Sequence, residues 1–96
     1  MQKGAKISAI RKIKISNESG LHARPASEFV RCVMRFKSEI TLRVNGKQLS
    51  GISIMDIMTA DIRKGAELEV TAEGVDADKA IDAIEKTIND LTLKGF

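Results

Sequence analysis

Hydrophobic and polar residues alternate in four short segments of the chain, and this alternation predicts four β-strands. The first segment is 11–15, in which Ile13 and Ile15 are separated by a lysine. The other three segments are 40–44, 47–50 and 66–72. Because successive residues of a strand point to opposite faces, the predicted sheet has one apolar face and one face in water, as antiparallel sheets do.

Apolar residues recur at intervals of three and four in two longer segments, which predicts two amphipathic helices. The first helix covers residues 23–34 and the second covers 77–91, with Asp76 placed to cap the second. A shorter helix of one or two turns is predicted for 53–59. The apolar stripes of the two long helices contain Ala26, Phe29, Val30, Val33 and Met34 in the first and Ala77, Ala80, Ile81, Ile84, Ile88 and Leu91 in the second.

The order of these elements predicts the fold. Asn45 and Gly46 form a dipeptide typical of a tight hairpin, so segments 40–44 and 47–50 are expected to pair. The full order of strand, helix, strand, strand, short helix, strand and helix predicts an α/β (α+β) open-faced β-sandwich. In this fold a four-stranded antiparallel sheet is covered on one face by two long helices and one short helix. Residues 1–96 are expected to form a single domain, with 1–10 as a basic N-terminal extension.

Charge and aromatic content narrow the possible partners. The chain of 96 residues has a net charge of +3, but residues 1–48 carry +8 and residues 49–96 carry −5. A basic half can bind nucleic acid, yet the chain has three Phe and no Tyr or Trp on which bases would stack. We therefore expect no nucleic-acid binding, and we expect the basic half to dock on acidic protein surfaces.

The numbers of cysteine and histidine residues and the hydropathy of the chain indicate its cellular compartment and whether it binds a cofactor. Cys32 is the single cysteine, so no intrachain disulfide is expected, and its place in a helical pattern predicts a small core or boundary residue. One His and one Cys argue against a zinc site, and no metal or other cofactor is expected. No apolar run is long enough to cross a membrane, and the N-terminal residues do not resemble a signal peptide. These features predict a monomeric cytoplasmic protein without membrane insertion.

The candidate chemical site is segment 20–27, Gly-Leu-His-Ala-Arg-Pro-Ala-Ser, which contains the only histidine, His22. Pro25 fits the first turn of a helix, so His22 is expected at a helix N-terminus, beside backbone N–H groups without intrahelical partners. Arg24 lies in the same turn, where a cation is unfavourable, and residues 21–27 offer no acid to offset it. A visiting anion would explain this arrangement, with the imidazole accepting a phosphoryl group. The alternative is that His22 is an ordinary capping or surface residue.

Segment 20–27 resembles the active-site segment of HPr, the histidine phosphocarrier family of the bacterial phosphotransferase system. Segment 53–58, Ser-Ile-Met-Asp-Ile-Met, resembles the regulatory-serine segment of that family, and segments 38–41 and 45–47 also match. The resemblance implies that Nδ1 of His22 accepts a phosphoryl group from the phosphoenolpyruvate-dependent enzyme I, with Arg24 as the second catalytic residue. It also implies delivery to a sugar-specific or nitrogen-branch EIIA-type acceptor. Such a protein is a carrier with a phosphohistidine intermediate rather than a free-standing enzyme.

The short helix at 53–59 is a second candidate site. Ser53 and Asp56 fit a capping box, which predicts a structural role for the serine. The resemblance implies in addition regulatory phosphorylation of Ser53 by a serine kinase, although Asp56 departs from the family pattern and would repel a phosphate. The helix carries more apolar residues than one or two turns can bury, so at least one is expected to be exposed. The resemblance implies a docking surface around the site formed by Met55, Met58, Arg31 and Arg35; the alternative for both methionines is a place in the core.

One further function stays open at this point. The chain is compatible with a regulatory interaction module that binds a transcription factor or an enzyme through the Ser53 helix. A metabolite-binding or nucleic-acid-binding domain is less compatible, because the chain lacks the aromatic residues and the glycine-rich phosphate loop that such domains use.

Overall fold

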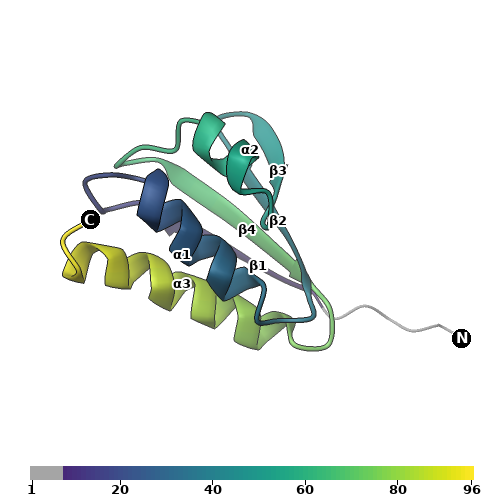
Figure 1. Cartoon of the computed structure of the whole chain (residues 1–96). Helices are drawn as coiled ribbons and strands as arrows, with labels where there is room; N and C mark the ends of the chain where they lie inside the picture. Colours follow the sequence, from purple (N-terminus) through teal and green to yellow (C-terminus); the bar gives the residue numbers. More distant parts are fainter. Residues whose placement is uncertain (1–7) are drawn as a thin grey trace, which may run out of the picture.

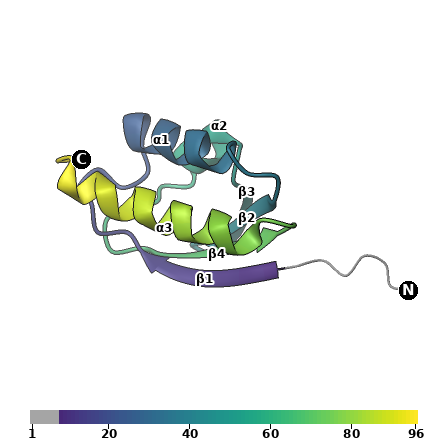
Figure 2. The ribbon, with the colours of Figure 1, turned by 90° about the horizontal axis from the view of Figure 1, so that it is seen from below.

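Four strands and three helices make up residues 8–96, which are the residues that the computed structural model describes. The strands are β1 (Ser8–Lys14), β2 (Glu39–Val44), β3 (Lys47–Ser50) and β4 (Glu67–Glu73), and the helices are α1 (Ala23–Val33), α2 (Ile54–Thr59) and α3 (Ala77–Leu93). The strands form one antiparallel sheet in the order β1-β4-β2-β3. All three helices lie on the same face of the sheet, with α1 between α2 and α3 (Figure 1, Figure 2). The predicted open-faced sandwich is confirmed.

The observed elements differ from the predicted ones mainly at their ends. β1 begins at Ser8, so residues 8–10 pair with β4 and belong to the sheet, which differs from the prediction that 1–10 form an extension. Residues 1–7 lie outside the described residues. The start of β1 does not show in the alternation because Ile10 points to the exposed face and is 64% exposed. α1 ends one residue before Met34, which is exposed rather than part of the apolar stripe.

The turn between β2 and β3 has the predicted hairpin geometry. Asn45 and Gly46 both have left-handed backbone conformations, with φ of 53° and 75°. Two consecutive residues of this kind form the type I′ turn, whose twist matches that of the paired strands. β3 therefore lies beside β2 at one edge of the sheet, over the range that the pattern predicted.

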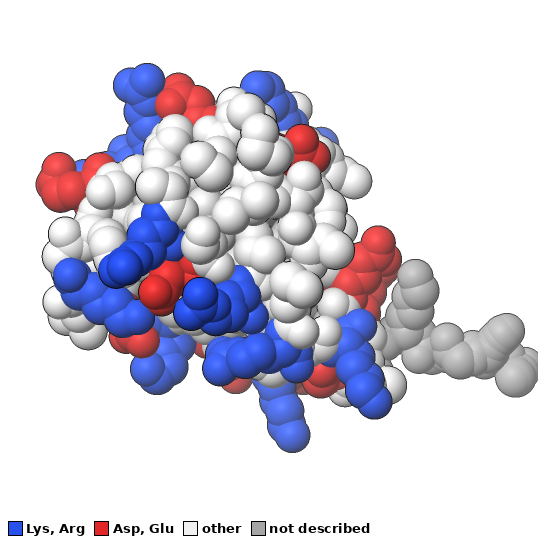
Figure 3. Space-filling model, viewed as in Figure 1, with Lys and Arg blue, Asp and Glu red and all other residues white. Residues whose placement is uncertain are grey.

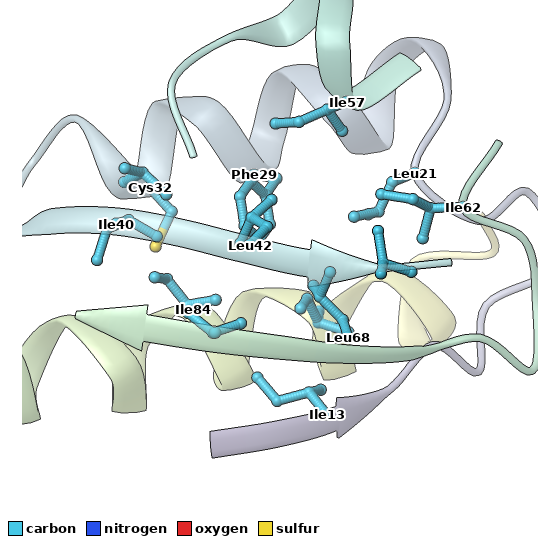
Figure 4. Close-up of a cluster of buried hydrophobic side chains, with 14 of the residues drawn as sticks. Ile13, Leu21, Phe29, Cys32, Ile40, Leu42, Ile57, Ile62, Leu68 and Ile84 are labelled. Carbon is cyan, nitrogen blue, oxygen red and sulfur yellow. The ribbon is translucent and has the colours of Figure 1, made fainter. Parts of the chain in front are cut away.

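The core fills the space between the sheet and the helices (Figure 4). Phe29 of α1 and Leu42 of β2 both belong to this cluster and are fully buried. Ile84 of α3 and Leu68 of β4 are buried in the same cluster, and Cys32 joins it from α1. The apolar face of the sheet and the apolar stripes of the two long helices thus meet as the periodicity predicts.

Asp76 occupies the predicted N-cap position of α3, but its side chain does not cap the helix. Its Oδ2 accepts a hydrogen bond from the N–H of Lys37 at 2.8 Å, and its Oδ1 accepts bonds from the N–H and the hydroxyl of Ser38. The bond from the Ser38 hydroxyl, followed by that from the Lys37 N–H, lowers the pKa of Asp76. The carboxylate therefore ties the start of β2 to the start of α3, a tertiary contact that replaces the local cap.

The face of the sheet away from the helices carries charged residues in register. Lys12 and Lys14 of β1 lie opposite Glu69 and Glu67 of β4. Arg43 of β2 lies opposite Glu69 from the other side. Cross-strand neighbours of opposite charge stabilise a sheet slightly, so this face is compatible with exposure to water.

Candidate functional site

His22 is the N-cap residue of α1, as predicted. Its backbone is extended, with φ of −119° and ψ of 157°, and its side chain makes no capping hydrogen bond. This result removes the alternative of a capping histidine. The imidazole is 43% exposed, so a partner protein can reach it. The N–H groups of the first turn of α1 lie beside it without intrahelical partners.

Ala23 holds an unusual backbone conformation directly after His22. Its φ is 48°, in the left-handed region that a residue with a Cβ rarely adopts. A single residue of this kind costs about 1–2 kcal/mol. The surrounding structure must therefore hold the backbone at the candidate site in place.

The loop before α1 is held against the connection between α2 and β4. Gly20, with φ of 63°, packs so closely that a Cβ there would lie 2.1 Å from the carbonyl oxygen of Ile62. The N–H of Leu21 donates to the same carbonyl oxygen at 2.9 Å. The buried side chain of Asn17 donates through Nδ2 to the carbonyl oxygen of Gly20 at 2.9 Å. These contacts fix the loop against the connection between α2 and β4, and so place His22 beside that connection.

Asp61, in that connection, is the residue of the site that sequence reasoning missed. Its Oδ1 lies 4.0 Å from Nε2 of His22 and accepts a hydrogen bond from Nε of Arg63 at 2.7 Å. The bond from Arg63 lowers the pKa of Asp61, and the neighbouring His22 and Lys47 act in the same direction. Residues 21–27 contain no acid, but the fold brings one from elsewhere. The prediction of a site without an acid to offset the positive charge considered residues 21–27 alone and was therefore incomplete.

Arg24 lies in the first turn of α1 but beside different neighbours from His22. Its guanidinium lies 5.7 Å from the centroid of the Phe96 ring, within the range of a cation–π contact. With Ser27, Glu28 and Arg31, it lines a surface hollow of about 450 Å³, and His22 is not among the lining residues. The structure therefore shows the guanidinium of Arg24 against the ring of Phe96.

Ser53 is the N-cap residue of α2, but its hydroxyl makes no capping hydrogen bond. The predicted capping box with Asp56 was therefore wrong. The reason is that the backbone N–H of Ser53, which Asp56 would reach in such a box, already donates to the carbonyl oxygen of Ser50 at 3.3 Å. The hydroxyl is left without the structural role that the pattern predicted.

The four predicted docking residues lie on two different surfaces. Met55 of α2 is 67% exposed, whereas Met58 is half-buried against the core. Arg31 and Arg35 line a hollow that also includes Thr87 of α3, so they border the groove between α1 and α3. Figure 3 shows a mostly uncharged surface over α2, with Lys and Arg side chains gathered below it over α1 and α3. The exposed methionine therefore lies on α2, whereas the two arginines lie along the groove between α1 and α3.

Among residues 8–96, no group of three or more His, Cys, Asp or Glu is arranged to hold a metal ion. No helix in this part of the chain is long and apolar enough to cross a membrane.

Comparison with known proteins identifies the relatives of this chain. A family model, the phosphorylation site of the HPr component of the phosphotransferase system, matches residues 9–90. The chain is 45% identical over 89 residues to phosphocarrier protein HPr of Mycoplasma capricolum. These aligned residues make up 93% of this chain and 96% of the relative. The structure is similar to HPr-C-His of Thermoanaerobacter tengcongensis, with a TM-score of 0.83 and 36% identity over 88% of this chain and 94% of that one. It is also similar to HPr of Bacillus anthracis, with a TM-score of 0.80 and 35% identity over 83% and 95% of the two chains.

The open-faced sandwich and the match to a phosphorylation-site family model together define the class of protein as a phosphocarrier. The chain belongs to the HPr family, the phosphocarrier proteins of the phosphotransferase system. The predicted family and function are confirmed at this level.

Proposed function

We propose that Nδ1 of His22 takes up and releases the phosphoryl group. The observation that carries this assignment is the position of the single histidine, which is exposed at the N-cap of α1 within the segment matched by the family model. In the uptake step the lone pair of Nδ1 forms the new P–N bond. The bond between phosphorus and the donor breaks, and the donor keeps that electron pair. The delivery step repeats this exchange, with His22 as the leaving group.

Positioning and charge neutralisation supply most of the catalysis, because the transition state of phosphoryl transfer is loose. The unpaired N–H groups at the start of α1 are donors suited to the phosphoryl oxygens. Arg24, in the same helix turn, supplies a guanidinium to these oxygens. The site therefore needs no metal or cofactor of its own for this exchange.

The partners we propose are enzyme I as the donor and an EIIA-type acceptor, sugar-specific or of the nitrogen branch. The protein acts as a monomer in the cytoplasm, without nucleic acid. Met55 offers a flexible apolar contact, and Met58 offers its exposed part. Arg31 and Arg35 favour a partner with an acidic surface, because complementary charge speeds association.

Ser53 is a second proposed phosphorylation site, which a serine kinase would modify. Its hydroxyl makes no capping bond, so modification would not cost the helix a cap. A phosphate there would carry about −1.5 to −2 charges and would be repelled by Asp56 in the same turn. Phosphorylation would then switch the binding of a transcription factor or an enzyme to α2. Incubation with a serine kinase that acts on this family and ATP should label Ser53. The proposal is contradicted if neither the wild-type protein nor the Asp56→Asn variant, which lacks the repelling charge, is labelled.

Mass spectrometry after incubation with phosphoenolpyruvate and enzyme I tests the role of His22. The expected result is a gain of one acid-labile phosphoryl group that maps to His22. The His22→Ala variant should remain folded, because the imidazole is exposed and makes no capping bond, and it should take up none. Uptake by this folded variant would show that another residue is the acceptor.

A further inference from the structure

The carboxylate of Asp61 approaches one particular nitrogen of the His22 ring. Its Oδ1 lies 4.0 Å from Nε2, which is the ring nitrogen that the proposed function leaves unphosphorylated. This separation is about 1 Å longer than a hydrogen bond, and a small rotation of either half-exposed side chain closes it. The carboxylate therefore lies on the Nε2 side of the ring, where a side-chain rotation would bring it within hydrogen-bond distance.

The backbone holds the two residues in this arrangement. The Leu21 N–H donates to the carbonyl oxygen of Ile62, so the residues next to His22 and next to Asp61 are bonded to each other. Asp61 itself has a left-handed backbone, with φ of 58°. Nδ2 of Asn45 donates to its carbonyl oxygen at 3.4 Å. Only side-chain rotations are then left to bring the carboxylate and the imidazole together.

Arg63 makes an acid tolerable beside a phosphoryl acceptor. A bare carboxylate would repel the incoming phosphoryl group. The guanidinium of Arg63 offsets this charge by donating from Nε to Oδ1 at 2.7 Å, and Lys47 lies near enough to act in the same direction. Because Arg63 lowers the pKa of Asp61, the carboxylate stays ionised at neutral pH and remains an acceptor for the imidazole N–H.

We propose that Asp61 is a positioning residue that keeps the proton of the neutral His22 ring on Nε2 and so presents an unprotonated Nδ1 to the phosphoryl donor. This inference rests on the proposed role of His22. A neutral imidazole carries its proton on one nitrogen, and a carboxylate next to Nε2 favours the proton there. During transfer the Nδ1 lone pair forms the P–N bond and the proton stays on Nε2. The ring then becomes cationic, and Asp61 stabilises that charge.

Two measurements on the Asp61→Asn variant test this inference. Asparagine tolerates a left-handed backbone, so the variant should fold like the wild type. The ¹⁵N chemical shifts of the His22 ring at about pH 9, where histidine side chains are neutral, report which nitrogen carries the proton. We expect the fraction protonated at Nε2 to fall. The rate of phosphoryl uptake from phosphoenolpyruvate and enzyme I should fall about tenfold, which is the low end of the cost of removing the hydrogen-bond partner of a histidine that binds a metal.

Asp78→Asn is the matched control, because it removes an exposed acid from the first turn of α3, which is part of neither the site nor the proposed docking residues, and should change neither the proton position nor the rate. If the Asp61→Asn variant keeps either the wild-type protonation of Nε2 or the wild-type rate, the inference is overturned. The two proposals fail in different ways. If the wild-type protein takes up no phosphoryl group at His22, the proposed function fails, whereas the ¹⁵N measurement needs no phosphorylation and still reports on Asp61.

Discussion

Replacing Gly20 with alanine should destabilise the protein more than the same change at a glycine in open space. The left-handed backbone at Gly20, with φ of 63°, costs an alanine about 1–2 kcal/mol. The new Cβ would also lie 2.1 Å from the carbonyl oxygen of Ile62 and 2.9 Å from Cα of Arg63. Both atoms belong to the backbone and cannot rotate away, so overpacking adds about 1–3 kcal/mol. The total loss of unfolding free energy is therefore about 2–5 kcal/mol.

Gly46→Ala is the control for the backbone part of this loss. Gly46 has φ of 75°, and a Cβ added there would have nothing within 4 Å, so only the cost of about 1–2 kcal/mol applies. Urea denaturation followed by far-ultraviolet circular dichroism measures both variants, since the chain has no Trp or Tyr for fluorescence. Equal losses for the two variants would refute the close packing of Gly20 on the connection that carries Asp61.

The remaining predictions concern Arg24 and Asp76. Arg24→Ala should slow phosphoryl uptake from enzyme I about 10- to 150-fold, which is the value of a hydrogen bond to a charged group. Arg43→Ala, on the open face of the sheet, is the control and should not slow it. Equal uptake rates for the two variants would show that Arg24 is not used. Because the folded pKa of Asp76 is lowered, its stabilising effect is complete above the unfolded pKa of about 3.9 and is lost as the pH falls through the folded value. At pH 7, Asp76→Ala should therefore lower the Tm, measured by circular dichroism, more than Asp78→Ala does. This loss of Tm should shrink below about pH 4. A loss that does not change with pH would contradict the prediction.

The periodicity of apolar residues was sufficient to predict the sheet and the helices, because burial repeats with the geometry of each element. Leu42 and Phe29 are buried in the core for this reason. The pattern failed for residues whose position depends on a distant partner or on the edge of the sheet. Ile10 is exposed on edge strand β1, and Asp76 bonds the start of β2 in place of its own helix.

The candidate site was predictable only along the local chain. The place of Pro25 was enough to predict His22 at a helix start. Asp61 reaches His22 through the connection between α2 and β4, and no spacing in the sequence indicates that the two meet. The contact of Arg24 with Phe96 depends in the same way on how α3 packs beside α1. The sequence therefore shows which chemical groups lie next to one another along the chain. Which groups they contact in space depends on the assembled fold.

The charged ladder on the open face of the sheet restricts misalignment of its strands. A shift of β1 by two residues along β4 keeps the apolar side chains inward, so burial alone does not oppose it. In one direction of shift Lys12 would face Thr71, and in the other Lys14 would face Gly65, so one lysine always loses its opposing glutamate. The apolar face cannot select one alignment, because its aliphatic side chains are nearly interchangeable. The charge pairs on the water-exposed face therefore add selectivity among the alignments.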